Sequence, residues 1–361
     1  MPLTSLDIIG FRNLEPLTLE CSAELNVIIG ANAAGKTSFL EAIYFLSRGR
    51  SFRTPRMRDM IRHSERSLQI VARVQGRYGS RPVVAGVAYD GVRSNARLDG
   101  EATRSLAQLT ACVPVLLLNP DSHRLLDDGP RQRRRFLDWG LFHAEARFWN
   151  IWRRYQTALR QRNAALRTHQ PQRILSAWDG ELVTAAEQLD KLRQKFCQVL
   201  TLELQPLIDA LLGSQSVNIE YQRGWSRERS LAEILHDEVM ADRRQGHTRL
   251  GPHRADFKIF IDGESTAQRL SRGQQKLLVI ALILTQARLY RLRHEYPCIL
   301  LIDDLPAELD PDNRDRVIDC LTTQSIQLFI TSINDMILKS AAWPDCRLFQ
   351  MTHGHIQEVL Q

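Results

Sequence analysis

The chain has 361 residues, of which 43% are hydrophobic and 25% charged, so it can bury two cores or one core with a large insertion, and disorder is excluded as its main state. Its formal net charge of +7 permits a polyanionic partner without requiring one. Six scattered cysteines without a C-x-x-C pair, and no apolar run of about 18 residues, favour a cytoplasmic protein that is neither exported nor membrane-spanning.

The N-terminal residues predict short strands at Leu3–Ile9, Pro16–Glu20 and Leu25–Ile29, followed by a helix from about Lys36. The loop between the last strand and this helix has the pattern G-x-x-x-x-G-K-T. Such a loop binds phosphate through its backbone N–H groups and its lysine, and its threonine can hold Mg²⁺. The predicted phosphate-binding residues are Gly30, Ala31, Asn32, Ala33, Ala34, Gly35, Lys36, Thr37 and Ser38.

An arginine-rich stretch from Arg48 to Arg66 follows, which we interpret either as a solvated loop or as a phosphate-contacting surface. Strand patterns at Ser67–Gln75, Pro82–Tyr89 and Val92–Leu98, separated by Asp-Gly turns, then predict an antiparallel sheet beside a parallel core.

A buried strand is predicted at Ala111–Leu118, after which the pattern becomes helical over Pro130–Arg167 and Gln172–Leu212. We interpret these helices as an arm. The window from Asp121 to Leu175 holds twelve Arg, no Lys and five acids. One helix face carries Trp149, Trp152, Leu159 and Leu166, which favours a core stripe over a base-stacking platform.

The arginines at 131–135 leave two interpretations open, since they can contact DNA phosphates or pair with acids such as Asp138. A strand at Val217–Gln222, a helix at Glu228–Arg244 and a strand at Asp256–Ile261 complete this region. Alternating helices and strands run from Leu270 to the end of the chain. We therefore expect two halves of one α/β ATPase domain, at 1–110 and 246–361, with a mainly helical arm inserted at 111–245.

The apolar run Cys298–Ile302 ends in two acids, Asp303 and Asp304. Neighbouring parallel strands present their carboxyl ends to one crevice, so this strand can hold a metal beside the phosphate loop. Asp303 is then the Mg²⁺-side acid, and Asp304 is the candidate for orienting or deprotonating the attacking water.

Two further segments narrow the class of protein. Leu270–Lys276 reads L-S-R-G-Q-Q-K at the start of a helix, and Ala307–Asp310 follows the acidic strand. The order of the four motifs resembles the ATP-binding-cassette superfamily. That resemblance implies a mixed sheet with flanking helices and an antiparallel subdomain, and a head-to-tail homodimer in which the signature helix of one subunit contacts the γ-phosphate on the other.

Further segments resemble the RecF family of bacterial recombination-mediator ATPases, which are related to SMC heads. They span nearly the whole chain: Phe11–Asn13, Glu41–Tyr44, Arg133–Asp138, Gln161–Asn163, Gly251–Asp256 and Leu270–Lys276. The resemblance implies a DNA-repair ATPase that hydrolyses ATP slowly, dimerises with ATP and binds double-stranded and gapped DNA. It also implies work with RecR and RecO in loading RecA, and a cytoplasmic, nucleoid-associated location.

Residue roles follow from the same resemblance. Lys36 and Thr37 would take phosphate and Mg²⁺, Asp303 the metal, and Asp304 the catalytic acid position. Ser271, Gly273 and Gln274 would contact the partner subunit's nucleotide, Asp310 would lie in the dimer-facing loop, and Arg12 and Asn13 would contact nucleotide. Catalysis is assigned to Asp304, Lys36 and Ser271, and the cofactors are ATP and Mg²⁺.

Some features depart from a transporter-type cassette. Asp304 replaces the usual Glu, which predicts slow turnover, and Thr331-Ser332 stands where a histidine is usual, so γ-phosphate sensing would rest on a hydroxyl. The segment Leu118–Asp121 occupies the glutamine-loop region without an assigned role. The histidines show no metal-ligand spacing, so we expect them to be solvent-facing or hydrogen-bonded.

Two competing functions remain. A transporter motor subunit shares the four motifs, but it does not explain the long helical insertion or the arginine content. A P-loop kinase acting on a small metabolite explains the phosphate loop and the acidic strand, yet it leaves Leu270–Lys276 without a purpose.

Overall fold

A computed structural model describes residues 2–76, 81–103, 105–304, 309–333 and 343–359, so Ala307 and Glu308 of the predicted motif lie outside it. The chain forms two compact units, one from residues 1–122 and 276–361 and the other from residues 123–275. We expected the boundaries between residues 110 and 111 and between residues 245 and 246. The observed boundaries differ because β8 (Val115–Leu118) pairs in the first unit and β10 (Asp256–Ile261) pairs in the second.

The first unit contains a six-stranded sheet in the order β15-β14-β3-β13-β12-β8. Three of its parallel strands, β3, β8 and β12, carry almost uninterrupted apolar runs, which suit strands covered on both faces. Besides β8, they are β3 (Leu25–Ile29), β12 (Ile299–Ile302), β13 (Gln327–Ser332) and β14 (Cys346–Thr352). Only β15 (His355–Glu358) is antiparallel. The carboxyl ends of β3, β12 and β13 therefore share one edge.

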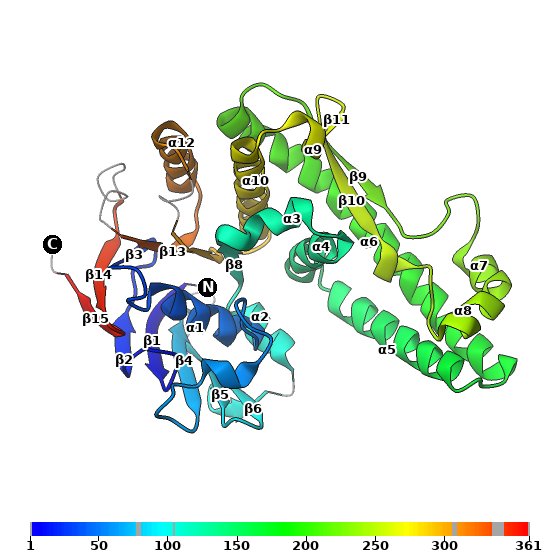
Figure 1. The fold of residues 1–361 in the computed structure, drawn as a ribbon, viewed down its shortest axis with the longest axis horizontal. Coiled ribbons are helices and arrows are strands. Elements are labelled where there is room, and N and C mark those ends of the chain that lie inside the picture. The colour runs from blue at the N-terminus through cyan, green and yellow to red at the C-terminus, as the bar shows by residue number, and fades with distance from the viewer. Residues whose placement is uncertain (1, 77–80, 104, 305–308, 334–342, 360–361) are drawn as a thin grey trace. The chain divides into compact units, whose positions relative to one another are not determined.

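A second six-stranded sheet in this unit is wholly antiparallel, in the order β2-β1-β4-β5-β6-β7, as predicted for its middle strands. Its strands are β1 (Leu3–Ile9), β2 (Leu17–Glu20), β4 (Leu68–Val74), β5 (Val83–Tyr89), β6 (Ser94–Leu98) and β7 (Glu101–Ala102). Helix α1 (Lys36–Arg48) packs on this sheet (Figure 1). One core cluster joins apolar side chains of both sheets and α1.

The part of the first unit that the structure describes has further helices. They are η1 (Met57–Met60), α2 (Leu106–Cys112), α12 (Pro311–Thr322) and α10 (Arg272–Arg291), which belongs to this unit from Lys276 onward. The predicted strand Ala111–Leu118 is wrong at its start, because α2 extends to Cys112 and is capped at its beginning by Ser105.

The second unit is built on α4 (Pro130–Ala144), α5 (Phe148–Arg167) and α6 (Gln172–Leu212), with the small sheet β11-β10-β9. Strand β9 is Val217–Gln222 and β11 is Glu264–Ser265. The short helices are α3 (Arg124–Asp127), α7 (Leu231–Asp237), α8 (Val239–Gln245) and α9 (Thr266–Arg269), with the 3₁₀ turn η4 (Pro252–Arg254). The 3₁₀ turn η3 (Pro120–His123) belongs to the first unit up to Ser122.

Two predicted helices are each divided in the structure. Pro130–Arg167 breaks after Ala144, where Glu145 adopts an extended conformation. Glu228–Arg244 becomes α7 and α8, because the helical conformation is interrupted at Glu238. Neither break contains Gly or Pro, so the sequence carries no local stop signal at these points.

The prediction of a single core stripe on α5 is partly wrong. Leu159 and Leu166 are buried, and they lie on a face shared with Phe148, Ile151 and Tyr155. Trp149 and Trp152 are instead only half-buried and stack on each other, with ring centroids 5.4 Å apart and planes 14° apart. The two tryptophans lie at the border of the buried face.

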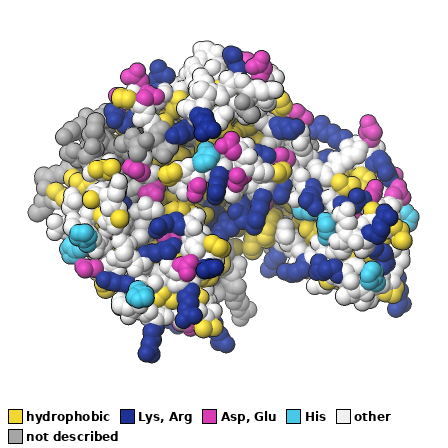
Figure 2. Space-filling model, viewed as in Figure 1, with side chains coloured by type: hydrophobic (Ala, Val, Ile, Leu, Met, Phe, Trp, Pro, Cys, Tyr) yellow, Lys and Arg dark blue, Asp and Glu magenta, His cyan; other side chains and the backbone are white. Residues whose placement is uncertain are grey.

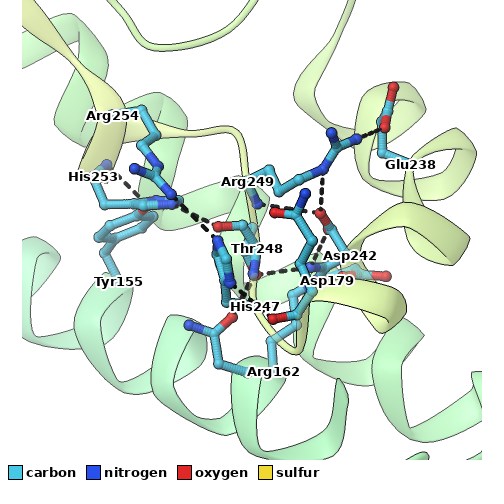
Figure 3. Close-up of polar contacts among 12 residues, drawn as sticks. Tyr155, Arg162, Asp179, Glu238, Asp242, His247, Thr248, Arg249, His253 and Arg254 are labelled. Atoms are coloured by element: carbon cyan, nitrogen blue, oxygen red, sulfur yellow. Dashed lines mark hydrogen bonds and ion pairs between the residues drawn. The ribbon is translucent and has the colours of Figure 1, made fainter. Parts of the chain in front are cut away.

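A buried polar junction ties α5 to the loop before η4 (Figure 3). Arg162 is fully buried and donates to Asp179 at 2.6 Å, and to Asp242 and Thr248 at 2.7 Å each. Arg249 pairs with Glu238. A cation bonded to carboxylates in this way can be buried, whereas the loss of one partner would leave a charge uncompensated.

Hydrogen bonds of His253 to Tyr155 and Thr248 hold the segment 251–256. Tyr155 Oη lies 2.6 Å from His253 Nδ1, and Thr248 O lies 2.9 Å from His253 Nε2 (Figure 3). Burial lowers the pKa of His253 to about 4, so the ring is neutral at pH 7. This histidine is hydrogen-bonded, as expected.

The arginines at 131–135 divide into two groups. Arg133 donates to Asp256 at 2.7 Å and 3.0 Å, and Arg134 donates to Ala255 O at 2.7 Å, so both brace the same loop. Asp138 pairs with Arg193 at 2.7 Å and not with Arg134 or Arg135, which corrects that part of our interpretation. Arg131 and Arg135 are exposed.

Candidate nucleotide-binding site

The phosphate loop joins β3 to α1, as predicted, and its backbone takes positive φ angles at Ala33 (63°) and Gly35 (118°). A Cβ on Gly30 would lie 2.4 Å from Met351 O, so this position admits only glycine without movement. Lys36 Nζ donates to Gly30 O at 2.6 Å and to Ala31 O at 3.0 Å. Burial lowers the pKa of Lys36, against the opposing effect of Asp304 and Asp303.

The first acid of β12 meets the loop threonine. Thr37 Oγ1 lies 3.1 Å and 3.0 Å from the two carboxylate oxygens of Asp303. A hydroxyl and a carboxylate at the end of a parallel strand are the hard oxygen donors that suit Mg²⁺. These two residues therefore fit a magnesium ion.

Thr331, at the end of β13, positions both acids. Its Oγ1 donates to Asp303 Oδ1 at 2.8 Å and accepts the N–H of Asp304 at 2.9 Å. The side chain is fully buried, so its hydroxyl supports the acids in this structure. Sensing of the γ-phosphate by a hydroxyl of Thr331-Ser332 stays a prediction. Asp304 itself has φ +57°, a conformation that Asp tolerates better than most residues and that is enriched at functional sites.

These groups open into a cavity of about 950 Å³, a size typical of small-molecule sites. Both halves of the first unit line it, together with the stretch after Arg48. The lining residues are Arg12, Asn13, Asn32, Ala33, Gly35, Lys36, Thr37, Ser38, Arg53, Arg58, Asp59, Ile61, His63, Pro120, Asp303 and Asp304. The arginine-rich stretch therefore reaches a cavity that is shaped for phosphate.

Arg12 and Asn13 support the loop from the side. Arg12 makes a bidentate pair with the fully buried Glu41, at 2.9 Å and 2.7 Å, and also donates to Asp59 O at 2.7 Å. Asn13 Oδ1 accepts from Ser38 Oγ at 2.9 Å. The Arg12 guanidinium thus holds the turn after β1 against α1, and contact of Arg12 or Asn13 with nucleotide stays a prediction.

The signature segment forms a capped helix start. Ser271 Oγ accepts from Gln274 N at 3.3 Å, and Gln274 Oε1 accepts from Ser271 N at 3.0 Å. This reciprocal pair is a capping box. Ser271 and Gly273 are exposed, and a Cβ on Gly273 would meet nothing within 4 Å, so this surface is open to a ligand.

Asp310 caps the next helix. Its carboxylate accepts from Asn313 N at 3.0 Å and Nδ2 at 2.6 Å, which lowers its pKa. In this subunit Asp310 therefore stabilises the start of α12, and its role at a dimer surface stays a prediction.

The sequence reasoning missed one brace of the phosphate loop. Gly354, in the turn between β14 and β15, donates its N–H to Ala34 O at 2.8 Å, and its carbonyl accepts from Glu15 N at 2.9 Å. Its φ is +86°, and a Cβ there would lie 1.9 Å from Asn13 O. The only signal in the sequence was a glycine between two short strands.

The sequence is similar to known proteins of one family. Residues 2–357 match the family model of the RecF/RecN/SMC N terminal domain. A DNA replication and repair protein RecF from Nitrosococcus oceani is 40% identical, and the match covers 100% of both chains. RecF proteins from Thioalkalivibrio sulfidiphilus and Pseudomonas aeruginosa are 40% and 38% identical, over 99% of this chain. The chain belongs to the RecF family.

Solved structures agree with this membership at the level of fold. The recombination mediator protein RecF-ATP in the RecFOR pathway matches with a TM-score of 0.88 and 22% identity, covering 99% of this chain and 98% of that chain. An Smc head bound to the C-winged helix domain of ScpA matches with a TM-score of 0.63 and 14% identity, covering 99% and 97%. The RecF fold is thus an SMC-type head, as predicted.

RecF membership does not favour the transporter motor or the metabolite kinase. Among the helices that the structure describes, none is long and apolar enough to cross a membrane. Within the same described residues, no group of three or more His, Cys, Asp or Glu side chains is arranged to hold a metal ion.

Proposed function

We propose that this protein is a slow, DNA-dependent ATP hydrolase that dimerises when it binds ATP and Mg²⁺, holds double-stranded or gapped DNA, and releases it after hydrolysis. In this proposal it works with RecR and RecO to load RecA at single-strand gaps, in the cytoplasm at the nucleoid. The observation that carries the proposal is the meeting of Thr37, Asp303 and Thr331 beside the phosphate loop. The ATP-bound state of a RecF protein of the same fold supports the choice of nucleotide.

The site residues divide the chemistry among them. The loop N–H groups from Gly30 to Ser38 and Lys36 Nζ would bind the phosphates once Lys36 leaves the carbonyls it now contacts. Thr37 and Asp303 would hold Mg²⁺, which when bound stabilises charge on the phosphoryl oxygens. Asp304 would orient the attacking water. Its side chain is one methylene shorter than that of Glu, which supports slow turnover.

Dimerisation would complete the site. Ser271, Gly273 and Gln274 form the start of α10, where Ser271 and Gly273 are exposed and where N–H groups attract anions. We propose that this start contacts the γ-phosphate held by the partner subunit, with Asp310 in the facing loop. The cassette-like order of motifs supports this head-to-tail arrangement.

The test is mass measurement of the protein with ATP and Mg²⁺ or with ADP, in the presence of a gapped duplex. We expect a dimer on DNA with ATP, and weaker DNA binding with ADP. Equal DNA affinity in the two nucleotide states would contradict the proposed control of DNA binding by ATP.

A matched pair of variants tests the shared site. Ser271→Arg should abolish both dimer and turnover, because a bulky cation would fill the contact with the partner's nucleotide. Ser230→Arg removes an equivalent capping box, that of α7, at an exposed position. Loss of either cap destabilises by about 1 kcal/mol, so dimerisation that fails equally in both variants would point to helix capping alone.

A further inference from the structure

Helix α5 has an unbalanced charge for a surface helix. Its twenty residues include five arginines and neither Asp nor Glu. Surface helices usually mix both signs, so that residues three or four apart form ion pairs. The surplus positive charge of this helix has to be balanced by other elements or by a partner.

Two of the five arginines are balanced within the second unit. Arg162 is buried and bonded to Asp179 and Asp242, and Arg154 donates to Glu181 at 2.7 Å and 3.0 Å. Arg153, Arg160 and Arg167 are exposed, and across the described residues none of them has a hydrogen bond or ion pair. We call these three residues the α5 arginine row.

The spacing of the α5 arginine row places it on one face. Its members are seven residues apart, which is close to two helical turns, so their side chains project in nearly the same direction about 10 Å apart. The buried residues Tyr155, Leu159 and Arg162 occupy other positions around the helix. In the view of Figure 2, Lys and Arg side chains lie over the region that α5 occupies in Figure 1.

Neighbouring groups favour phosphate over bases as the ligand. Trp149 is stacked on Trp152 and meets the edge of Phe142 at 5.9 Å, so these rings already use their faces and edges on one another. The stem of Arg167 packs on the chain at Gly246, where an added Cβ would lie 3.1 Å from it. The α5 arginine row therefore presents guanidinium groups, with the stem of Arg167 supported at Gly246, beside tryptophans that stack on each other.

We propose that the α5 arginine row is a contact surface for the sugar-phosphate backbone of duplex DNA. The spacing of about 10 Å corresponds to about three base-pair steps of 3.4 Å, so successive arginines can reach phosphates along one strand. Such contacts give affinity without sequence preference and depend steeply on salt. This inference rests on the proposed DNA-binding function and assigns it a surface.

The test compares two triple variants with the same loss of charge. Arg153, Arg160 and Arg167 are changed together to Gln in one, and Arg154, Arg229 and Arg269 in the other. The control arginines are 47%, 45% and 45% exposed, and each is paired with a carboxylate of the same unit. Binding to a duplex of arbitrary sequence, with ATP and Mg²⁺, is measured between about 50 and 200 mM salt.

We expect the row variant to lose on the order of 100-fold in affinity at about 0.1 M salt, and its slope of log K against log salt to be shallower by about 2.7. The control variant should keep nearly the full slope. The single variant Arg160→Gln should be shallower by about 0.9, which keeps the test available if the triple variant folds poorly.

The outcomes separate the two proposals. If the unmodified protein binds no DNA in any nucleotide state, the proposed function fails. If it binds, but the row variant behaves like the unmodified protein or like the control variant, the α5 surface is overturned and the row serves another partner or none.

Discussion

At the residue scale, a single hydroxyl organises the acidic end of β12. Thr331 both donates to Asp303 and accepts from the N–H of Asp304, which uses the donor and an acceptor position of one hydroxyl. Because Asp304 has a left-handed backbone, an accepting atom at this point stabilises a conformation that would otherwise be costly. Thr331 is therefore a positioning residue for the proposed metal site.

Thr331→Val should raise the Mg²⁺ concentration for half-maximal ATP hydrolysis by about 10- to 100-fold, since outer partners of metal ligands have effects of this size. The measurement is a Mg²⁺ titration of hydrolysis and of nucleotide binding. Thr285→Val is the control, because Thr285 is equally buried and its hydroxyl donates only to Ala281 O within α10. Equal shifts in both variants would contradict a specific role for Thr331.

His253 should make stability depend on pH. Its pKa is lowered to about 4 by burial, while the unfolded chain keeps about 6.5. The unfolded state therefore binds more protons between these values, and stability falls by up to about 3 kcal/mol as pH drops from about 6.5 to 4. Denaturant unfolding at several pH values should show that the free energy of unfolding depends less on pH in His253→Gln. His236→Gln, at an exposed site, should leave this dependence unchanged.

At the element scale, the β14–β15 hairpin supports the phosphate loop through the turn at Gly354. Gly354→Ala should weaken nucleotide binding and lower the melting temperature, because a Cβ would overlap Asn13 O. Gly263→Ala is matched in backbone strain, with φ +81° against +86°, but has open space around it. Thermal unfolding and nucleotide titration that fail to separate the two variants would argue against the brace.

The polar junction of α5 allows a second element-scale test. Arg162→Leu should destabilise the second unit by about 3–5 kcal/mol, because it leaves the carboxylates of Asp179 and Asp242 without their cation. Arg154→Leu, on the same helix, breaks an exposed pair and should cost no more than about 1 kcal/mol. Chemical unfolding of both variants measures the difference, and similar values would refute the importance of burial.

At the scale of the whole molecule, the two units should respond differently to nucleotide. The cavity lies wholly in the first unit, so ligand at about 100 times its Kd should stabilise that unit by about 2.7 kcal/mol. Hydrogen exchange with ADP, which should not promote the dimer, is expected to slow up to about 100-fold in β3 and β12. Comparable slowing in α6 would show that the units do not open separately.

Much of this architecture was predictable from local signals. The bounds of β1, β3, α6, β9 and β10 match the predictions, because apolar patterns there end at turn residues. The helix breaks at Glu145 and Glu238 carry no such residue. The roles of Thr331 and Gly354 could not be inferred, since they arise only when β13 and β14 pair with β3 from the other end of the chain.

That pairing also has a consequence for biosynthesis. The loop at Gly30–Thr37 is translated before β13 and β14, and its strand β3 gains these two neighbours only after they have been made. About 290 residues separate Thr37 from β13, which at about 5–20 residues per second corresponds to roughly 15–60 s of synthesis. A nascent chain in which β13 and β14 have not yet been made therefore lacks the strands that flank β3 at this site, and a truncated product without β14 and β15 would lack the brace at Gly354.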